Sequence, residues 1–268
     1  MVQVSTREIN HGCVGSAGEF MPRPSRRWAL FLDVDGTLLD IAATPEAVVV
    51  PSELAPLLAR LDRSLRGAVA LISGRTTDCV GRLFAPLALP IIGQHGAEYR
   101  GVARLNETGA AALDSVRVAA RHVAMEYPGI LVEDKGVTIA VHYRRVPERG
   151  DDVLAAMTRA VECSGEALEI LHGRCVVDAR PRGADKGAAL RALMAEPPFQ
   201  GRVPVVVGDD ATDEDAFQAA LDHGGSAIQV GPRRTPLSAH WVPGPDGVRR
   251  WLRSVVDRLD REDRRCRI

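Results

Sequence analysis

The stretch Trp28-Ala-Leu-Phe-Leu-Asp-Val-Asp35-Gly36-Thr37 is an apolar run that ends in two acids and a glycine. Its short length and its glycine stop favour a buried strand over a helix. Further apolar runs lie at 68–72, 89–92 and 203–207, and a glycine-containing polar cluster follows each of them. Leucines at helical spacing between 54 and 65 separate the first two runs, and this order predicts βαβ units around a parallel sheet.

The middle of the chain has a different pattern. It predicts a long amphipathic helix over 113–127, an alternating strand over 137–143, a second helix over 153–161 and a strand over 175–179. After this region the first pattern returns, with a helix near 186, strands at 203–207 and 227–230, and a closing helix over 248–259.

These patterns predict an α/β protein, a doubly wound parallel-sheet core with a smaller α+β domain inserted in it. The expected boundaries are a flexible leader at 1–26, a core of 27–103 and 181–262, the inserted domain at 104–180, and a tail at 263–268.

The composition excludes several classes of partner. Lys and Arg together number 34 and Asp and Glu 35, and this balance argues against duplex nucleic acid or an acidic membrane as a partner. No apolar run is long enough to span a bilayer, and the first residues lack the apolar segment of a secretory signal. The five cysteines are scattered without a Cys-x-x-Cys, which argues against a zinc site or a disulfide framework. We therefore expect a cytoplasmic protein.

Polar clusters follow three of the predicted strands and should meet at one site. They are Asp33-Val-Asp35-Gly36-Thr37, Ser73-Gly74-Arg75 and Gly208-Asp209-Asp210-Ala-Thr-Asp213. Ligands of an open parallel sheet bind beyond the carboxyl ends of its strands, which is where all three clusters should lie. A fourth segment, Gly183-Ala-Asp-Lys186-Gly187, opens a helix, and a helix start beside a lysine favours an anion.

The residue types in these clusters suit phosphoryl transfer. Asp33 and Asp35 are two residues apart, so an extended backbone points both carboxylates to one side. A cation such as Mg²⁺ would relieve their repulsion, and Asp209 and Asp210 offer further oxygens. The Ser73 hydroxyl and the Lys186 ammonium complete a set that can position and neutralise a phosphoryl group. Each piece alone is more often a turn, a helix cap or a solvated lysine, and only their joint order favours a site.

The same residues carry a resemblance to a known superfamily. Phe31-Leu-Asp33-Val-Asp35-Gly-Thr-Leu-Leu39 resembles the first motif of the haloacid dehalogenase superfamily, and Ser73, Lys186 and the acids 209–213 resemble the other three. Five strings resemble the trehalose-6-phosphate phosphatase family in particular. They are Ile72-Ser-Gly-Arg75, Gln94-His-Gly-Ala-Glu98, His142-Tyr-Arg144, Arg180-Pro-x-Gly-x-x-Lys-Gly187 and Gly208-Asp-Asp-x-Thr-Asp-Glu-Asp-Ala-Phe217.

The resemblance implies a role for each core residue. Asp33 would be the nucleophile that forms an aspartyl-phosphate, and Asp35 would protonate the leaving sugar oxygen and then activate water. The phosphoryl oxygens would be held by Ser73, Gly74 and Lys186. Mg²⁺ would be bound by Asp33, Asp209 and the backbone carbonyl of Asp35, with Asp210 and Asp213 as further ligands or as neighbours of the ligands.

The resemblance also implies that residues 104–180 form a cap over the site. Glu133, Lys135 and Arg144 match sugar-contacting positions of the family, although a solvated strand face would show the same residues. Arg174 and Asp178 stand where the family often has Lys and Glu, so their charge is kept but their reach differs. His95 either lines the pocket or ends a strand.

The function that the resemblance implies is an Mg²⁺-dependent phosphatase of trehalose 6-phosphate. The alternatives are a phosphatase of sucrose 6-phosphate or mannosyl-3-phosphoglycerate, and a non-catalytic sugar-phosphate-binding module. The Asp-Asp-x-Thr-Asp-Glu-Asp string argues against the other sugars, and the intact set of five core residues argues against a non-catalytic module. We expect a monomer with a small-molecule substrate, able to act beside a trehalose-6-phosphate synthase.

Overall fold

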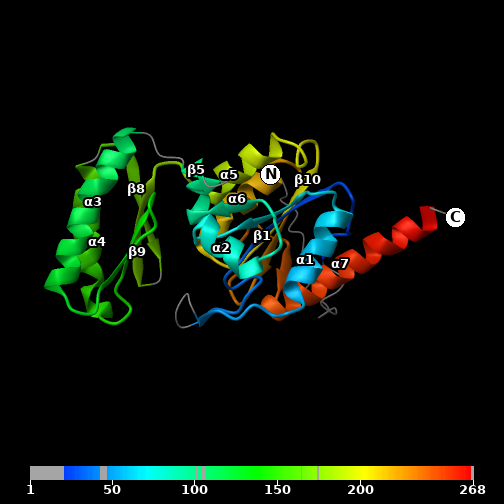
Figure 1. Ribbon diagram of the computed structural model, residues 1–268, viewed down its shortest axis with the longest axis horizontal. Coiled ribbons are helices and arrows are strands. Elements are labelled where there is room, and N and C mark those ends of the chain that lie inside the picture. Colours follow the sequence, from blue (N-terminus) through cyan, green and yellow to red (C-terminus); the bar gives the residue numbers. More distant parts are fainter. Residues whose placement is uncertain are drawn as a thin grey trace, which may run out of the picture.

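The computed structural model contains two β-sheets, each with its own helices, which lie side by side (Figure 1). It describes residues 21–42, 47–99, 102–103, 107–163, 165–173 and 175–266. The first 20 residues of the expected leader, Arg174 and the last two residues lie outside this description.

The larger sheet has eight strands in the order β12-β11-β10-β1-β2-β3-β4-β5. Their bounds are β1 Trp28–Asp33, β2 Val69–Ile72, β3 Ile91–Gly93, β4 Glu98–Tyr99, β5 Val102–Ala103, β10 Val203–Gly208, β11 Ser226–Val230 and β12 His240–Val242. The strands from β12 to β3 pair in parallel, and β4 and β5 are antiparallel. Strand order reverses at β1, which lies between β10 and β2, so the carboxyl end of β1 is the topological switch point.

Helices cover both faces of this sheet. On one face lie α1 (Leu54–Ser64), α2 (Thr77–Phe84) and α7 (Pro245–Cys266), and on the other lie α5 (Lys186–Met194) and α6 (Glu214–Asp222). Alternate residues of β1 point to opposite faces of the sheet. Leu30 and Leu32 pack against the face covered by α1, α2 and α7, and Ala29 and Phe31 pack against the face covered by α5 and α6. The predicted α/β, doubly wound core is confirmed.

The smaller sheet is antiparallel, in the order β6-β7-β9-β8. Its strands are β6 Leu131–Asp134, β7 Ile139–His142, β8 Leu168–Gly173 and β9 Val176–Pro181, and its helices are α3 Glu107–Glu126 and α4 Gly150–Glu162. Val141 and Val177 face the helices, whereas Glu133, His142 and Asp178 lie on the other face of the sheet. That face is turned toward the core, with the helices outside (Figure 1). We propose that each sheet with its helices forms a domain, and we call the smaller one the cap.

Several elements differ from the sequence expectation, and two of the differences have a clear physical reason. Helix α7 spans Pro245–Cys266, which is longer than the closing helix expected over 248–259. Its apolar periodicity stops at Leu259, but the Asp, Glu and Arg residues that follow continue the helix without an apolar face. Strand β6 was not predicted, because its sequence Leu-Val-Glu-Asp is exposed or half-buried and contains no apolar run. No helix among the described residues is long and apolar enough to cross a membrane.

Candidate active site

The site lies at the carboxyl edge of the larger sheet, as the sequence predicts. Asp33 is the last residue of β1 and pairs with Ile72, so Ser73 follows directly on the neighbouring strand. On the other side Leu32 pairs with Val207, and Asp209 follows one residue beyond the end of β10.

Lys186 lies between two acids at the first position of α5. Its Nζ donates to Oδ1 of Asp33 at 2.8 Å and to Oδ1 of Asp213 at 2.6 Å. All three residues are buried, with exposed fractions of 3%, 6% and 1%. Burial by itself lowers the pKa of Lys186, but the charges of Asp213 and Asp33 raise it above its ordinary value, so the ammonium stays charged. Burial also raises the pKa of Asp33, although Lys186 opposes that shift.

The carboxylates of Asp33, Asp209 and Asp213 form a cluster whose oxygens lie within 4.8 Å of one another. The hydroxyl of Thr37 donates to Oδ1 of Asp209 at 3.2 Å, and a Cβ at Gly36 would collide with the Asp209 carboxylate. Burial, and then the charges of Asp213 and Asp210, raises the pKa of Asp209 to about 7. Carboxylates outnumber the ammonium here, and hard oxygen donors without thiolate or imidazole suit Mg²⁺.

Asp213 shapes the acidic loop (residues 208–213) rather than offering a free carboxylate. Its Oδ2 accepts from the backbone nitrogens of Asp209 and Asp210 at 2.9 and 3.1 Å, and its Oδ1 accepts from Lys186. The Asp210 side chain turns back to cap its own loop, accepting from the nitrogen and the hydroxyl of Thr212 at 2.7 and 2.6 Å. Asp33 and Asp209 are therefore the side chains best placed to hold a cation.

Asp35 is clamped by Arg75, a contact that sequence analysis did not identify. Arg75 Nε donates to Oδ2 of Asp35 at 2.7 Å, and Nη2 donates to Oδ1 at 2.8 Å. These hydrogen bonds raise the pKa of the guanidinium, and together they orient the Asp35 side chain. The backbone nitrogen of Arg75 donates to the hydroxyl of Ser73 at 3.1 Å. The Ser-Gly-Arg string was the available signal, but only the fold shows which acid the arginine meets.

His95 packs its ring against Gly74. A Cβ on Gly74 would collide with the ring, so the loop of residues 73–77, which we call the phosphate loop, needs glycine there. Burial, and then the charges of Lys186 and Lys135, lowers the pKa of His95 to about 3. The ring is therefore neutral at physiological pH, and its buried Nδ1 has no hydrogen-bond partner among the described residues.

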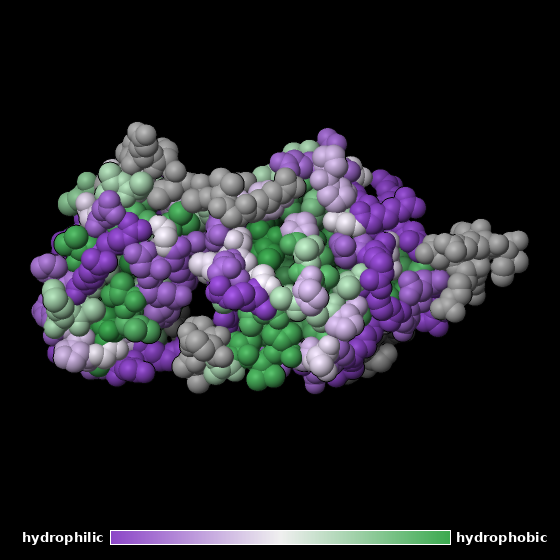
Figure 2. Space-filling view, in the orientation of Figure 1, coloured by the Kyte–Doolittle hydropathy of each residue, from purple (hydrophilic) through white to green (hydrophobic). Residues whose placement is uncertain are grey.

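Two of the predicted sugar-contacting residues lie on the core-facing side of the cap. Glu133 accepts from Nε2 of His142 at 3.0 Å, which lowers the pKa of Glu133. Lys135 reaches across to the core, where its Nζ donates to the carbonyl of Gly74 at 3.2 Å. Figure 2 shows hydrophilic residues gathered on this side of the cap.

The remaining cap residues have different surroundings. Asp178 is 7% exposed, and its Oδ1 has no partner among the described residues. Burial raises the pKa of Asp178, against the opposing charges of Lys135 and His142. Arg144 follows β7 and is exposed, so it does not join this group in the described structure. Arg174 lies outside the described residues.

Gln229 is a further residue that sequence analysis missed. It is 1% exposed on β11, and its Nε2 donates to the carbonyl of Asp209 at 2.7 Å. A polar residue inside the apolar run 227–230 was the available signal, because a buried amide needs partners.

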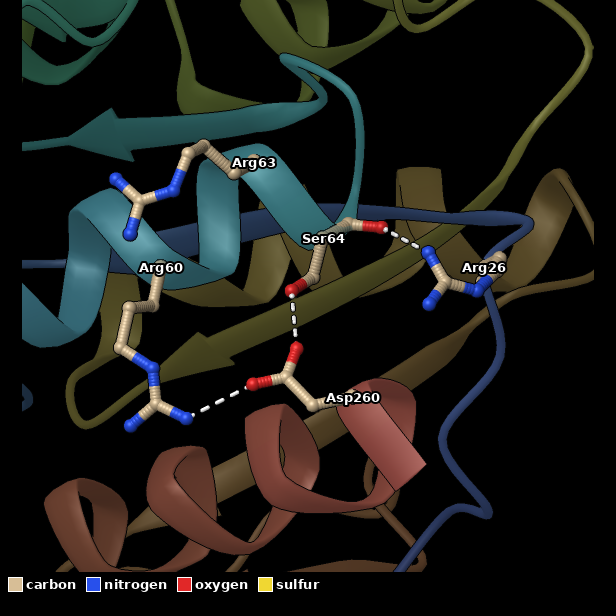
Figure 3. A pocket seen from close by; sticks show the side chains of 5 residues that line it. All are labelled: Arg26, Arg60, Arg63, Ser64 and Asp260. Atoms are coloured by element: carbon tan, nitrogen blue, oxygen red, sulfur yellow. Dashed lines mark hydrogen bonds and ion pairs between the residues drawn. The ribbon is translucent and has the colours of Figure 1, made fainter. Parts of the chain in front are cut away.

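A separate pocket lies at the opposite, amino edge of the core sheet, between α1 and α7 (Figure 3). It is lined by Arg26, Arg60, Arg63, Ser64 and Asp260. Arg26 donates to the carbonyls of Ser64 and Leu259, and Arg60 pairs with Asp260 at 2.9 Å. These contacts join the start of β1 to the two helices and have a structural role.

Comparison with known proteins identifies the family. A family model described as trehalose-phosphatase matches residues 31–241. A probable trehalose-phosphate phosphatase of Sinorhizobium fredii (strain NBRC 101917 / NGR234) is 44% identical over 234 residues, which cover 87% of each chain. The chain belongs to the trehalose-phosphatase family. It is therefore an enzyme, a phosphatase of the haloacid dehalogenase type, and the predicted resemblance is confirmed.

Other relatives agree with this assignment. The trehalose-6-phosphate phosphatase of Escherichia coli (strain K12) is 36% identical over 244 residues, covering 90% of this chain and 91% of its own. A solved trehalose-6-phosphate phosphatase related protein is 26% identical, with a TM-score of 0.71, over 87% of this chain and 99% of that one. The C-terminal domain of C. albicans trehalose-6-phosphate phosphatase, at 20% identity and a TM-score of 0.75 over 87% and 93% of the two chains, shares the fold.

Proposed function

We propose that this trehalose-phosphatase family member hydrolyses trehalose 6-phosphate to trehalose and phosphate, with Mg²⁺ and through an aspartyl-phosphate on Asp33. The observation that carries the proposal is the position of Asp33 at the switch point, between the ammonium of Lys186 and the carboxylate of Asp209. Asp33 and Asp209 would hold Mg²⁺, together with the backbone carbonyl of Asp35. When bound, the cation would neutralise charge on the phosphoryl oxygens.

In the first half-reaction the Asp33 carboxylate attacks phosphorus and the bond to the sugar oxygen breaks. Lys186, Ser73 and the backbone nitrogen of Gly74 hold the phosphoryl oxygens while charge develops on them. Asp35 gives its proton to the departing sugar oxygen. Both oxygens of Asp35 accept from Arg75, so the proton that Asp35 carries would occupy a lone pair that the guanidinium leaves open.

In the second half-reaction Asp35 is a carboxylate again and takes a proton from water. The water oxygen bonds to phosphorus, the acyl-phosphate bond to Asp33 breaks, and phosphate leaves with Asp33 restored. The contact with Arg75 orients the Asp35 carboxylate for this step.

The decisive experiment is phosphate release from a panel of sugar phosphates, with excess Mg²⁺ or with EDTA. We expect trehalose 6-phosphate to be the best substrate, ahead of sucrose 6-phosphate, mannosyl-3-phosphoglycerate and glucose 6-phosphate. A different preferred sugar would overturn the substrate assignment and leave the chemistry in place. If no sugar phosphate released phosphate, the proposed function would be contradicted.

We predict that EDTA abolishes turnover, that Mg²⁺ restores it, and that Mg²⁺ affinity rises with pH through about 7. The folded pKa of Asp209, about 7, lies above its unfolded value of about 3.9, so the stability it contributes to the metal-free protein is lost as pH rises through 7. A cation binds the charged carboxylate, so Mg²⁺ binding should release more protons at pH 6 than at pH 8. Calorimetric titration in buffers of different ionisation enthalpy measures this, and equal proton release at both pH values would contradict it.

Glu133→Gln should lower kcat/KM on trehalose 6-phosphate by about tenfold or more, because an amide cannot match a carboxylate as acceptor for buried sugar hydroxyls. Turnover of p-nitrophenyl phosphate, which lacks a distal sugar, should stay within about twofold. Lys135→Met serves as the contrasting variant. Its ammonium contacts Gly74 of the phosphate loop, so we expect losses on both substrates, where the sequence alone predicts a loss on the sugar phosphate only. Equal losses for Glu133→Gln on both substrates would remove its role in sugar recognition.

The monomeric state, action beside a synthase and a cytoplasmic location stay predictions. Sedimentation of the purified protein, alone and mixed with a trehalose-6-phosphate synthase, tests the first two.

A further inference from the structure

The segment Gln94-His-Gly-Ala-Glu98 lies where three parts of the molecule meet. The backbone nitrogen of Gln94 donates to the carbonyl of Arg75 at 2.8 Å, which joins the segment to the phosphate loop. A Cβ on Gly96 would collide with the carbonyl of Asp185, the residue that caps α5 ahead of Lys186. The third neighbour is the cap, through the turn between β6 and β7.

That turn, residues 135–138, is what we call the cap hairpin. The nitrogen of Lys135 donates to the carbonyl of Thr138 at 3.0 Å and closes the turn. The hydroxyl of Thr138 donates to Oε1 of Gln94 at 2.9 Å, and both residues are only 3% exposed. Val137 packs with Ala97 and Ala184 in a small apolar cluster beside this bond. The cap hairpin is therefore docked on the core through a buried hydrogen bond and an apolar contact.

The amide of Gln94 continues the contact into the core. Its Nε2 donates to Oε2 of Glu98 at 3.1 Å. Glu98 in turn accepts from the backbone nitrogen of Thr77 at 3.0 Å and from the Thr77 hydroxyl. Because both the Nε2 and the Oε1 of Gln94 are hydrogen-bonded, the side chain is held in one orientation with Oε1 facing Thr138.

The docked hairpin places Lys135 beside the phosphate loop. The Lys135 side chain leaves the same turn three residues before Thr138 and donates to the carbonyl of Gly74. We propose that Thr138 and Gln94 are positioning residues, whose hydrogen bond docks the cap hairpin so that Lys135 holds the phosphate loop. The cap then supports turnover even of a phosphate ester that has no sugar to contact. The proposal deepens the proposed function, because it assumes phosphatase chemistry at the phosphate loop.

Thr138→Val tests the proposal, since it keeps the shape of a β-branched strand residue and removes the hydroxyl. An unmade buried hydrogen bond leaves Gln94 Oε1 unpaired, so we expect kcat/KM on p-nitrophenyl phosphate to fall about fivefold to tenfold. Thr138→Ser should recover most of the activity. Thr235→Val is the matched control, because Thr235 is also a buried threonine, 8% exposed, and its hydroxyl accepts from the backbone nitrogen of Leu237 in a core loop.

A double-mutant cycle separates positioning from general destabilisation. In the Lys135→Met background, Thr138→Val should change p-nitrophenyl phosphate turnover by less than about twofold, because its effect passes through Lys135. The same fold loss in both backgrounds, or an equal loss from Thr235→Val, would overturn the proposal. If the wild type hydrolyses p-nitrophenyl phosphate but not trehalose 6-phosphate, the proposed substrate fails while this cycle still tests the docking contact.

Discussion

Asp33→Asn should reduce phosphate release by about 10,000-fold or more while the fold stays intact. The amide has nearly the shape of the carboxylate but is a poor nucleophile, and it carries no charge for a cation. Lys186 keeps its partner Asp213 in the variant. Since burial raises the pKa of Asp33, removing its charge should leave the unfolding temperature of the metal-free protein unchanged or higher.

Phosphate release and calorimetric unfolding of the same preparations measure the two effects. Asp62→Asn is the matched control, because Asp62 is a partly buried acid on α1 whose pKa is also raised by burial and which lies away from the site. The covalent mechanism predicts that the phosphoryl group of the substrate labels the wild type at Asp33 and leaves Asp33→Asn unlabelled. Near-normal turnover of Asp33→Asn would exclude Asp33 as the nucleophile.

Lys186→Met should abolish turnover and also lower the free energy of unfolding by about 3–5 kcal/mol at neutral pH. The ammonium holds Asp33 and Asp213 in a buried site, and methionine leaves both carboxyls without their cation. The folded pKa values of both acids should then rise further above their unfolded values. A raised carboxyl pKa contributes stability at low pH that is lost as pH rises, so the loss in Lys186→Met should be largest at high pH and shrink toward pH 5.

Denaturant unfolding of both proteins between pH 5 and pH 8 checks this prediction. Lys186→Arg keeps the charge but changes its shape, so it should restore part of the stability and little of the activity. A constant stability difference across the pH range would show that Lys186 acts through packing and that its charge has no role.

The local pattern was sufficient to place the main candidate residues at strand ends and at a helix start. Asp33 ends its strand, and Ser73 and Asp209 each follow one. The apolar runs of these strands are continuous, because a parallel sheet covered by helices buries both faces of its strands. Lys186 opens a helix behind Asp185, whose carboxylate caps the nitrogen of Ala188 at 2.6 Å. These signals are local, so the sequence alone carries them.

Contacts between segments that are distant in the sequence could not be predicted from local sequence patterns. Arg75 meets Asp35 across 40 residues, Gln229 meets the carbonyl of Asp209 across 20, and Thr138 meets Gln94 across 44. A side chain's partner in such a contact depends on strand order and on how the cap lies against the core.

The sequence by itself determined the fold class and the family, and it supplied the candidate residues for phosphoryl transfer, because apolar periodicity and strand-end motifs are short-range properties of the chain. Only the tertiary structure decided that Asp213 organises the acidic loop, that Arg75 clamps Asp35 and that the cap hairpin docks beside Gly74. The physical reason is that hydrogen bonding and charge are satisfied in three dimensions, by groups that approach one another only after the sheet and the cap have formed.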